Sequence, residues 1–207
     1  MHRRRQTHRP GRPLHLLLPE LSEAMTDHRI ILFRGMNTGG VRAPVTEQRA
    51  MAEAMGLKNP RTLLASGNLV VESDRDPGDL EAAVEDAFEA TFGRRIAAIV
   101  RTPEQWRALI QANPFAAEAT DAPSRVLLLL TRDPVPPAAI DAVRAYAVDG
   151  ERVETVSAGG GAVVFWFANG MGRSRMAERP VGPGVVTGRN WNTVLKLAAM
   201  VGLETAA

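Results

Sequence analysis

The residues best suited to chemistry in this chain lie in short segments rich in glycine, asparagine and arginine. Histidine occurs only at positions 2, 8, 15 and 28, and there is no cysteine. Residues 29–207 therefore lack the side chain that titrates nearest neutral pH, thiolate nucleophiles, Ser-His-Asp triads and ordinary zinc ligands. The arginines, asparagines and backbone N–H groups that remain suit the binding of an anion better than the transfer of a proton.

Two such segments are expected to meet at one edge of a β-sheet. The first, RGMNTGG over residues 34–40, follows an apolar run, and the second, SGN over residues 66–68, has the composition of a hairpin turn. In a β-α-β-β-α-β unit, the end of the first strand and the turn between the second and third strands share an edge. The candidate ligand-binding residues here are Arg34, Asn37, Gly39, Ser66 and Asn68. The alternative is a glycine-rich turn in which Arg34 makes a structural salt bridge and Asn68 has a positive φ.

A second pair of segments is expected to share an edge in the second half of the chain. They are NGMGRSR over residues 169–175 and RNWNT over residues 189–193, the latter at the start of a predicted helix. A helix N-terminus with nearby arginines favours an anion. The candidate residues are Arg173, Ser174, Arg189, Asn190 and Asn192. The alternative is that Asn190 simply caps the helix and Trp191 belongs to the core.

Other candidate sites are weaker. The carboxylates Glu72, Asp74 and Asp76 are close in sequence, but a polar turn that ends in a helix N-cap explains them as well as a divalent ion does. The three glycines at 159–161 are typical of a hairpin turn. No metal site and no cofactor is predicted.

The order of elements predicts an α+β fold made of two ferredoxin-like β-α-β-β-α-β halves, related by duplication and joined by a helical connector. In the first half we expect strands at 29–34, 62–65, 69–72 and 96–101, and helices at 44–55 and from Asp76-Pro77 to Gly93. A capping box at Thr102–Gln105 opens a connecting helix. In the second half we expect strands at 126–130, 152–156, 162–167 and 184–187, and helices at 137–147, 170–176 and 191–200. The predicted units are residues 25–101, 102–124 and 125–207.

The charge distribution argues against a nucleic-acid-binding body. The pI is about 9.6, yet residues 29–207 carry equal numbers of basic and acidic side chains. The excess lies in residues 1–28, and residues 1–24 are predicted to be a disordered tail or a mis-assigned start before Met25. Their apolar stretch is too short for a secretory signal, and no run approaches a membrane span. The expectation is a cytoplasmic protein with no membrane contact.

Five segments in order resemble the bacterial family called domain of unknown function 1697. They are FRGMNTGG (33–40), SGNL (66–69), NPF (113–115), GMGRSR (170–175) and RNWNTV (189–194). The family pattern often has Gln where Ala65 stands, and Lys where Arg175 stands. The resemblance spans roughly residues 29–201 and implies the duplicated α+β fold, but it implies no activity.

Taken together, these patterns favour a protein that binds a small anionic ligand, a nucleotide or phosphorylated metabolite, in a cleft between its halves. One alternative is an enzyme of unknown reaction that uses Arg and Asn electrostatics or a carboxylate-bound metal. The other is a nucleic-acid-binding module, which would need solvent-facing aromatics on central strands. The oligomeric state is left open.

Overall fold

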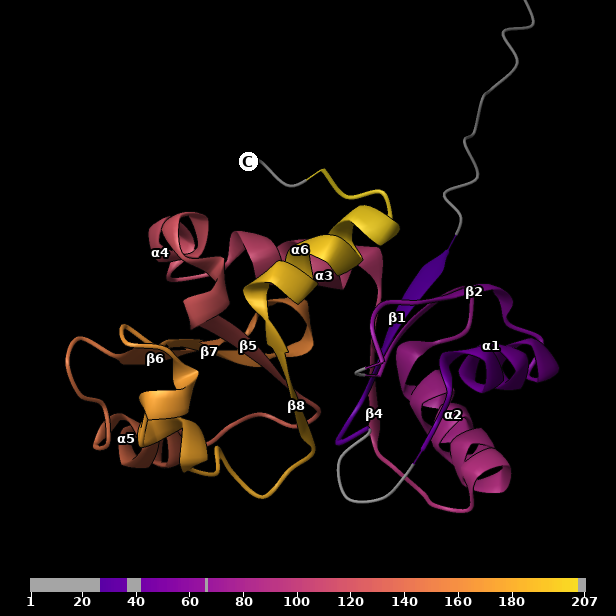
Figure 1. Ribbon diagram of the computed structural model, residues 1–207, viewed down its shortest axis with the longest axis horizontal. Coiled ribbons are helices and arrows are strands. Elements are labelled where there is room, and N and C mark those ends of the chain that lie inside the picture. The colour runs from indigo at the N-terminus through magenta and orange to yellow at the C-terminus, as the bar shows by residue number, and fades with distance from the viewer. Residues whose placement is uncertain (1–26, 37–41, 66, 205–207) are drawn as a thin grey trace, which may run out of the picture.

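The computed structural model describes residues 27–36, 42–65 and 67–204. Within them the fold is α+β, with two four-stranded antiparallel sheets and six α-helices (Figure 1). The first sheet contains β1 (His28–Phe33), β2 (Lys58–Thr62), β3 (Asn68–Glu72) and β4 (Ala98–Arg101). The second contains β5 (Val126–Thr131), β6 (Arg152–Val156), β7 (Ala162–Trp166) and β8 (Val186–Asn190).

The strands follow the same spatial order in both sheets. The first sheet runs β2-β3-β1-β4 and the second β6-β7-β5-β8. The first sheet carries α1 (Val45–Ala54) and α2 (Pro77–Phe92), whereas the second carries α5 (Pro137–Arg144). Where an α-helix was expected at 170–176, the chain forms two 3₁₀ turns, η3 (Met171–Arg173) and η4 (Met176–Glu178).

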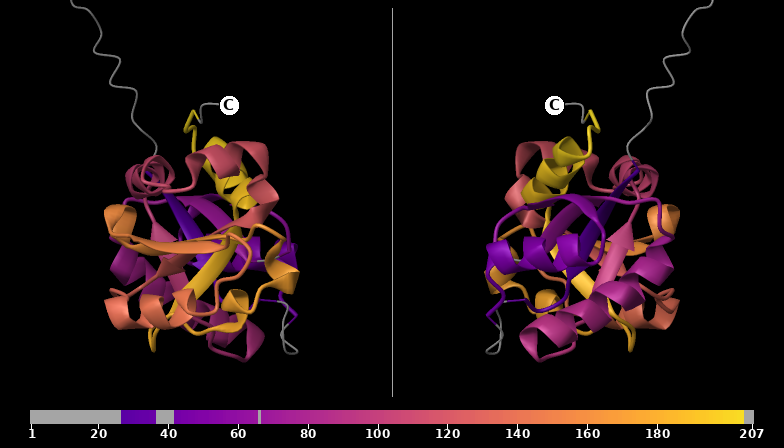
Figure 2. Two further views of the ribbon diagram at one scale, coloured as in Figure 1. Left: turned by 90° about the vertical axis from the view of Figure 1, so that its left-hand side faces the viewer. Right: turned by 90° about the vertical axis from the view of Figure 1, so that its right-hand side faces the viewer.

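Helices lie outside the two sheets and at one end between them. Figure 2 shows α1 and α2 covering the outer face of the first sheet, and α5 on the outer side of the second. The helices α3 (Pro103–Gln111), α4 (Ala116–Asp121) and α6 (Trp191–Met200) gather at one end (Figure 1). No helix in the described part of the chain is long and apolar enough to cross a membrane.

Local signals account for most helix boundaries. The Asp76 side chain accepts a hydrogen bond from the Gly78 N–H at the start of α2, and Gly93 ends that helix with φ 72°. At α3, Thr102 and Gln105 form the expected capping box. These helices begin and end where the sequence places caps and glycine.

Two strands differ from their expected positions. The strand β2 comes earlier than the predicted 62–65, because Asn59-Pro60 has the composition of a turn but lies in an edge strand. Proline is tolerated there, beside a register shift between Lys58 and Arg61. The strand β8 comes later than the predicted 184–187, and it places Arg189 opposite Leu128 of β5.

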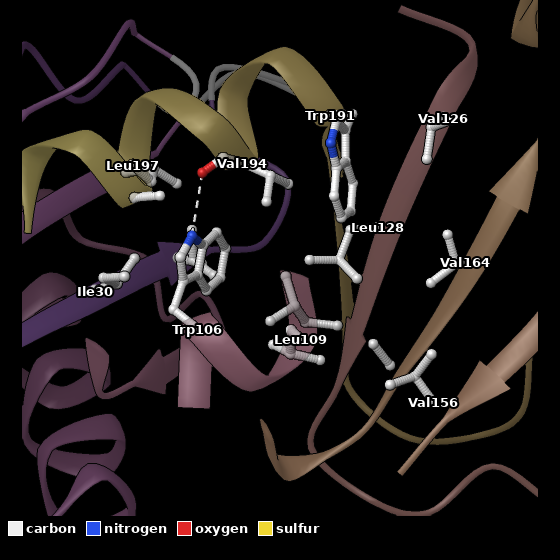
Figure 3. Close-up of a cluster of buried hydrophobic side chains, with 14 of the residues drawn as sticks. Ile30, Trp106, Leu109, Val126, Leu128, Val156, Val164, Trp191, Val194 and Leu197 are labelled. Carbon is white, nitrogen blue, oxygen red and sulfur yellow. Dashed lines mark hydrogen bonds between the residues drawn. The ribbon is translucent and has the colours of Figure 1, made fainter. Parts of the chain in front are cut away.

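The main core lies between the two sheets. Along β5, Val126, Leu128 and Leu130 point into this central cluster, whereas Leu127 and Leu129 face the outer cluster under α5. Trp106 of α3 is fully buried there and donates a 3.1 Å hydrogen bond from Nε1 to the carbonyl of Val194 in α6 (Figure 3). Each large side chain in the cluster contributes roughly 1.5–3 kcal/mol to stability through its burial. Because the cluster contains side chains from both sheets, the two halves share a core.

Candidate functional site

The buried side chain of Arg189 joins the two halves of the molecule. Because Arg189 pairs with Leu128 on the inward face of the second sheet, its guanidinium points toward the first sheet. Nε donates to Asn68 Oδ1, Nη1 to Thr187 Oγ1 and the Gly188 carbonyl (both 2.8 Å), and Nη2 to the Phe33 and Gly67 carbonyls (both 3.0 Å). These contacts use all five N–H groups of the guanidinium.

A tight turn in the first sheet presents the carbonyls that Arg189 binds. Gly67 has φ 81°, and a Cβ added to it would lie 3.1 Å from the Cβ atoms of Phe33 and Met36. The Phe33 N–H also donates to the Gly67 carbonyl at 2.9 Å. The end of β1 and the β2–β3 turn therefore meet, as the topology predicts.

Arg189, one of the candidate ligand-binding residues, lines the pocket described below, but its side-chain N–H groups are engaged by the protein. The sequence places it before a helix, but β8 includes it and turns its side chain into the interface. Burial lowers the pKa of Arg189 to about 10, which keeps it protonated at neutral pH. No carboxylate pairs with it in the described ranges, so its positive charge is stabilised by dipoles but not neutralised.

An open pocket of 510 Å³ lies beside Arg189, between the two halves. Its lining comes from the end of β1, from β8 and from the first turn of α6, and contains no Asp or Glu. The lining residues are Phe33, Arg34, Gly35, Met36, Val186, Thr187, Gly188, Arg189, Asn190 and Thr193. Arg34 is exposed, and its backbone N–H is fixed by the Ala97 carbonyl at 2.8 Å. The structural salt bridge considered for Arg34 has no counterpart in the described part of the chain.

Asn190 caps α6, as the alternative interpretation expects. Its Oδ1 accepts from the Asn192 N–H at 3.1 Å, and its Nδ2 donates to the Ser124 carbonyl at 2.8 Å. The exposed Asn192 side chain donates back to Asn190 Oδ1 at 3.2 Å and is not in the pocket lining. Trp191 is 4% exposed and belongs to the central cluster.

Asn68 is buried rather than open to a ligand. Besides binding Arg189, its Nδ2 donates to the Leu63 carbonyl at 2.9 Å. The positive φ considered for Asn68 falls instead on Leu64 (59°) and Gly67 (81°). The predicted site residues Asn37, Gly39 and Ser66 lie outside the described residues.

Arg173 and Ser174 are not brought to this pocket. Ser174 Oγ accepts from the N–H groups of Met176 and Ala177, and Met176 packs in the outer cluster under α5. Figure 1 shows this segment beside α5, on the side of the second sheet away from the first. Only the second of the two predicted segments of the second half therefore faces the first half.

Sequence reasoning missed a second arginine contact between the halves. Arg132 of the second half binds Glu81 Oε2 at 3.1 Å and also pairs with Glu85, both on α2. Arg101 of β4 donates to the carbonyls of Thr131 (2.8 Å) and Gly160 (3.1 Å). Glu81 and Glu85 lie one helical turn apart, beside the apolar stripe of α2. This spacing is the sequence signal for the contact, but it does not identify Arg132 as the partner.

Glu85 is held ionised in this contact. Burial alone would raise its pKa, but hydrogen bonds from Arg132 and the Ala98 N–H, and the charges of Arg132 and Arg95, outweigh it and lower the pKa below the ordinary value. These carboxylates are therefore committed to arginines. Across the described ranges, no group of three or more His, Cys, Asp or Glu side chains is arranged to hold a metal.

Comparison with known proteins gave a family and similar solved structures. A family model described as "protein of unknown function (DUF1697)" matches residues 25–160. A solved structure, described as that of conserved bacterial protein SP0830 from Streptococcus pneumoniae, is 18% identical with a TM-score of 0.64. That similarity covers 84% of this chain and 98% of the pneumococcal chain, and at this identity it shows the fold alone. No match was found among curated proteins.

Proposed function

The chain belongs to the DUF1697 family of proteins of unknown function, and we propose that it binds a small anionic ligand in the pocket between its two halves. A nucleotide or phosphorylated metabolite fits the proposal. The observation that carries it is that two guanidinium groups and the first turn of a helix line this pocket, with no acidic residue among them.

The electrostatics of the pocket support an anion. The charge of Arg189 is buried and has only neutral acceptors, so no carboxylate of the described residues cancels its field toward the pocket. The N-terminus of α6 adds a partial positive charge from the same side. A phosphate or carboxylate would therefore enter a region of positive potential in which Arg34 is the accessible cation.

The groups proposed to touch the ligand are some of the residues predicted from sequence, with Thr193 added. Arg34 would pair with the anion, and Thr193 would donate from the first turn of α6. Asn37, Gly39 and Ser66 remain proposed contacts because their segments adjoin the pocket residues. Arg189, Asn68 and Asn190 position the walls, since their side-chain groups are engaged with the protein.

The two halves are proposed to be ferredoxin-like units, residues 25–101 and 125–207, joined by the connector 102–124. The equal strand order of the two sheets supports this, although η3 and η4 occupy the position of the second helix in the second half. Side chains of the central strands β1, β3 and β7 are buried along almost their whole length, and on the central strand β5 the half-buried Leu127 and Leu129 pack against the cluster under α5. This leaves the central strands no open face on which bases could stack, and favours the pocket over a nucleic-acid surface.

The test is a calorimetric titration of the full chain with inorganic pyrophosphate, with adenosine 5′-monophosphate and with uncharged adenosine. We expect saturable binding of at least one anion, weakened by added salt because the attraction is electrostatic. Arg34→Gln should weaken it at least about tenfold, the loss of one charge-assisted contact.

Arg173→Gln is the matched control, because Arg173 is also an exposed arginine but lies outside the pocket. It should change the affinity less than about twofold. Binding that Arg34→Gln leaves intact, or the absence of binding to either anion, would refute the proposal. An equal loss in both variants would place the anion elsewhere.

A further inference from the structure

A second pocket, separate from the anion pocket, lies in the layer formed by α3, α4 and α6. It has a volume of 630 Å³, within the range of small-molecule sites. Its lining is Arg107, Ile110, Gln111, Asn113, Ala116, Ala119, Thr120, Pro123, Trp191, Leu195, Leu203 and Glu204. No residue of this set lines the anion pocket, although α6 contributes to both.

The pocket combines an apolar wall with a few polar groups. Trp191 and Leu203, both buried, continue the central cluster into the wall (Figure 3 shows Trp191 beside Leu128). Arg107 is exposed at the rim and makes no ion pair with any described residue. The lining has one cation, Arg107, and one carboxylate, the exposed Glu204, so it suits a mostly apolar molecule whose single anionic end lies on the side of Arg107.

Asn113 supplies the observation that points to a ligand. Its side chain accepts a 3.0 Å hydrogen bond from the Phe115 N–H through Oδ1, which fixes the orientation of the amide. The opposite atom, Nδ2, is buried and has no acceptor among the described residues, and Asn113 is only 7% exposed. Buried donors in folded proteins are nearly always paired. Because this donor has already lost its water, an acceptor that reaches it gains a hydrogen bond at little further cost.

We propose that this pocket binds a small apolar carboxylate, with its hydrocarbon or aromatic body against Trp191 and Leu203 and its carboxylate oxygens on Asn113 Nδ2 and Arg107. The proposal gives the Asn-Pro-Phe segment at 113–115 a role that the anion pocket does not use. Oδ1 of Asn113 accepts from the Phe115 N–H within the turn after α3, whereas Nδ2 has no partner among the described residues.

The experiment titrates the full chain with decanoate, and with decanol as the uncharged counterpart, by calorimetry and tryptophan fluorescence. We expect saturable one-to-one binding of decanoate, tighter than that of decanol, with a change in emission because Trp191 lines the pocket. Arg107→Gln should reduce the affinity for decanoate about tenfold and bring it close to that for decanol.

Asn113→Asp tests the buried donor. It retains the oxygen that accepts from the Phe115 N–H, but replaces Nδ2 by a second acceptor that repels a carboxylate. We expect at least about a tenfold loss of decanoate affinity. Arg173→Gln, at an exposed arginine that lines neither pocket, is the control and should change decanoate affinity less than about twofold. Arg107 and Asn113 line only this pocket, so failure of this proposal is distinguishable from failure of the proposed anion pocket.

Two results would overturn the inference. One is the absence of saturable decanoate binding to the unmodified chain. The other is equal affinity for decanoate and decanol that Arg107→Gln leaves unchanged, which would show only unspecific apolar contact. If Asn113→Asp does not fold, the Arg107→Gln comparison decides, because Arg107 is exposed and makes no ion pair with any described residue.

Discussion

Arginines connect the two halves of this protein in two regions, and the regions differ in how the charge is compensated. Arg132 faces the carboxylates of Glu81 and Glu85, whereas Arg189 faces carbonyls, a hydroxyl and an amide oxygen. Both regions hold the sheets together through hydrogen bonds. Only the second leaves a net positive charge, and the acid-free pocket lies beside it. The contacts of Arg132 therefore serve only the fold, whereas the region of Arg189 can also attract an anion.

The largest effect is expected from Arg189→Ala. The change removes five hydrogen bonds and leaves the carbonyls of Phe33 and Gly67 without this partner, so the free energy of unfolding should fall by about 3–5 kcal/mol. Urea unfolding measures it. Arg189→Lys keeps the charge with fewer donors and should lose less; a loss under about 1 kcal/mol for Arg189→Ala would show that the halves do not depend on this contact.

Gly159→Ala tests the region of Arg101. Gly159 has φ 61°, and a Cβ would lie 2.3 Å from the Gln105 carbonyl oxygen of α3. We expect a loss of about 2–4 kcal/mol from backbone strain and overpacking. Gly170→Ala is the matched control, since Gly170 has φ 86° but nothing within 4 Å of a Cβ, and it should show the strain alone, about 1 kcal/mol. Equal losses of stability in the two variants would mean that the close approach of Gly159 to α3 does not contribute to stability.

Glu85→Gln weakens the compensated region by roughly 1–3 kcal/mol at neutral pH, because Arg132 and the Ala98 N–H lose a charged acceptor. The folded pKa of Glu85 is lowered, so its contribution is present above its ordinary pKa and is lost as the pH falls through the folded value. The unmodified chain should therefore lose more stability between about pH 5 and pH 3 than the variant does. Parallel acid profiles from thermal unfolding would contradict this role.

The smallest effect on stability is expected from Arg34→Gln. The side chain is exposed and makes no ion pair with a described residue, so unfolding should change by no more than about 0.5 kcal/mol. The same variant is expected to lose anion binding, which makes it the counterpart of Arg189→Ala. A destabilisation above about 1.5 kcal/mol would show that Arg34 is structural as well, and would remove the distinction between the two arginines of the pocket.

The sequence by itself determined the features that depend on neighbouring residues. Asp76-Pro77 and Gly93 bound α2, the Thr102–Gln105 box opens α3, and Asn190 caps α6, because each of these interactions closes within a few residues. The meeting of the β1 end with the turn at Gly67 also followed, since it depends only on the order of the strands. The strand β2 was predicted too late in the chain because an Asn-Pro pair, here Asn59-Pro60, is compatible both with a turn and with an edge strand.

Tertiary structure alone decided what the arginines do. Arg34, Arg132 and Arg189 look alike in sequence, and nothing near them tells which one is buried. The strand β8 ends three residues later than predicted, which places Arg189 in the sheet, and alternation along the strand then turns its side chain inward. Its partners at Phe33, Gly67 and Asn68 lie more than 120 residues away. Whether an arginine binds the fold or a ligand depends on such distant acceptors, and only the packing of one sheet on the other supplies them.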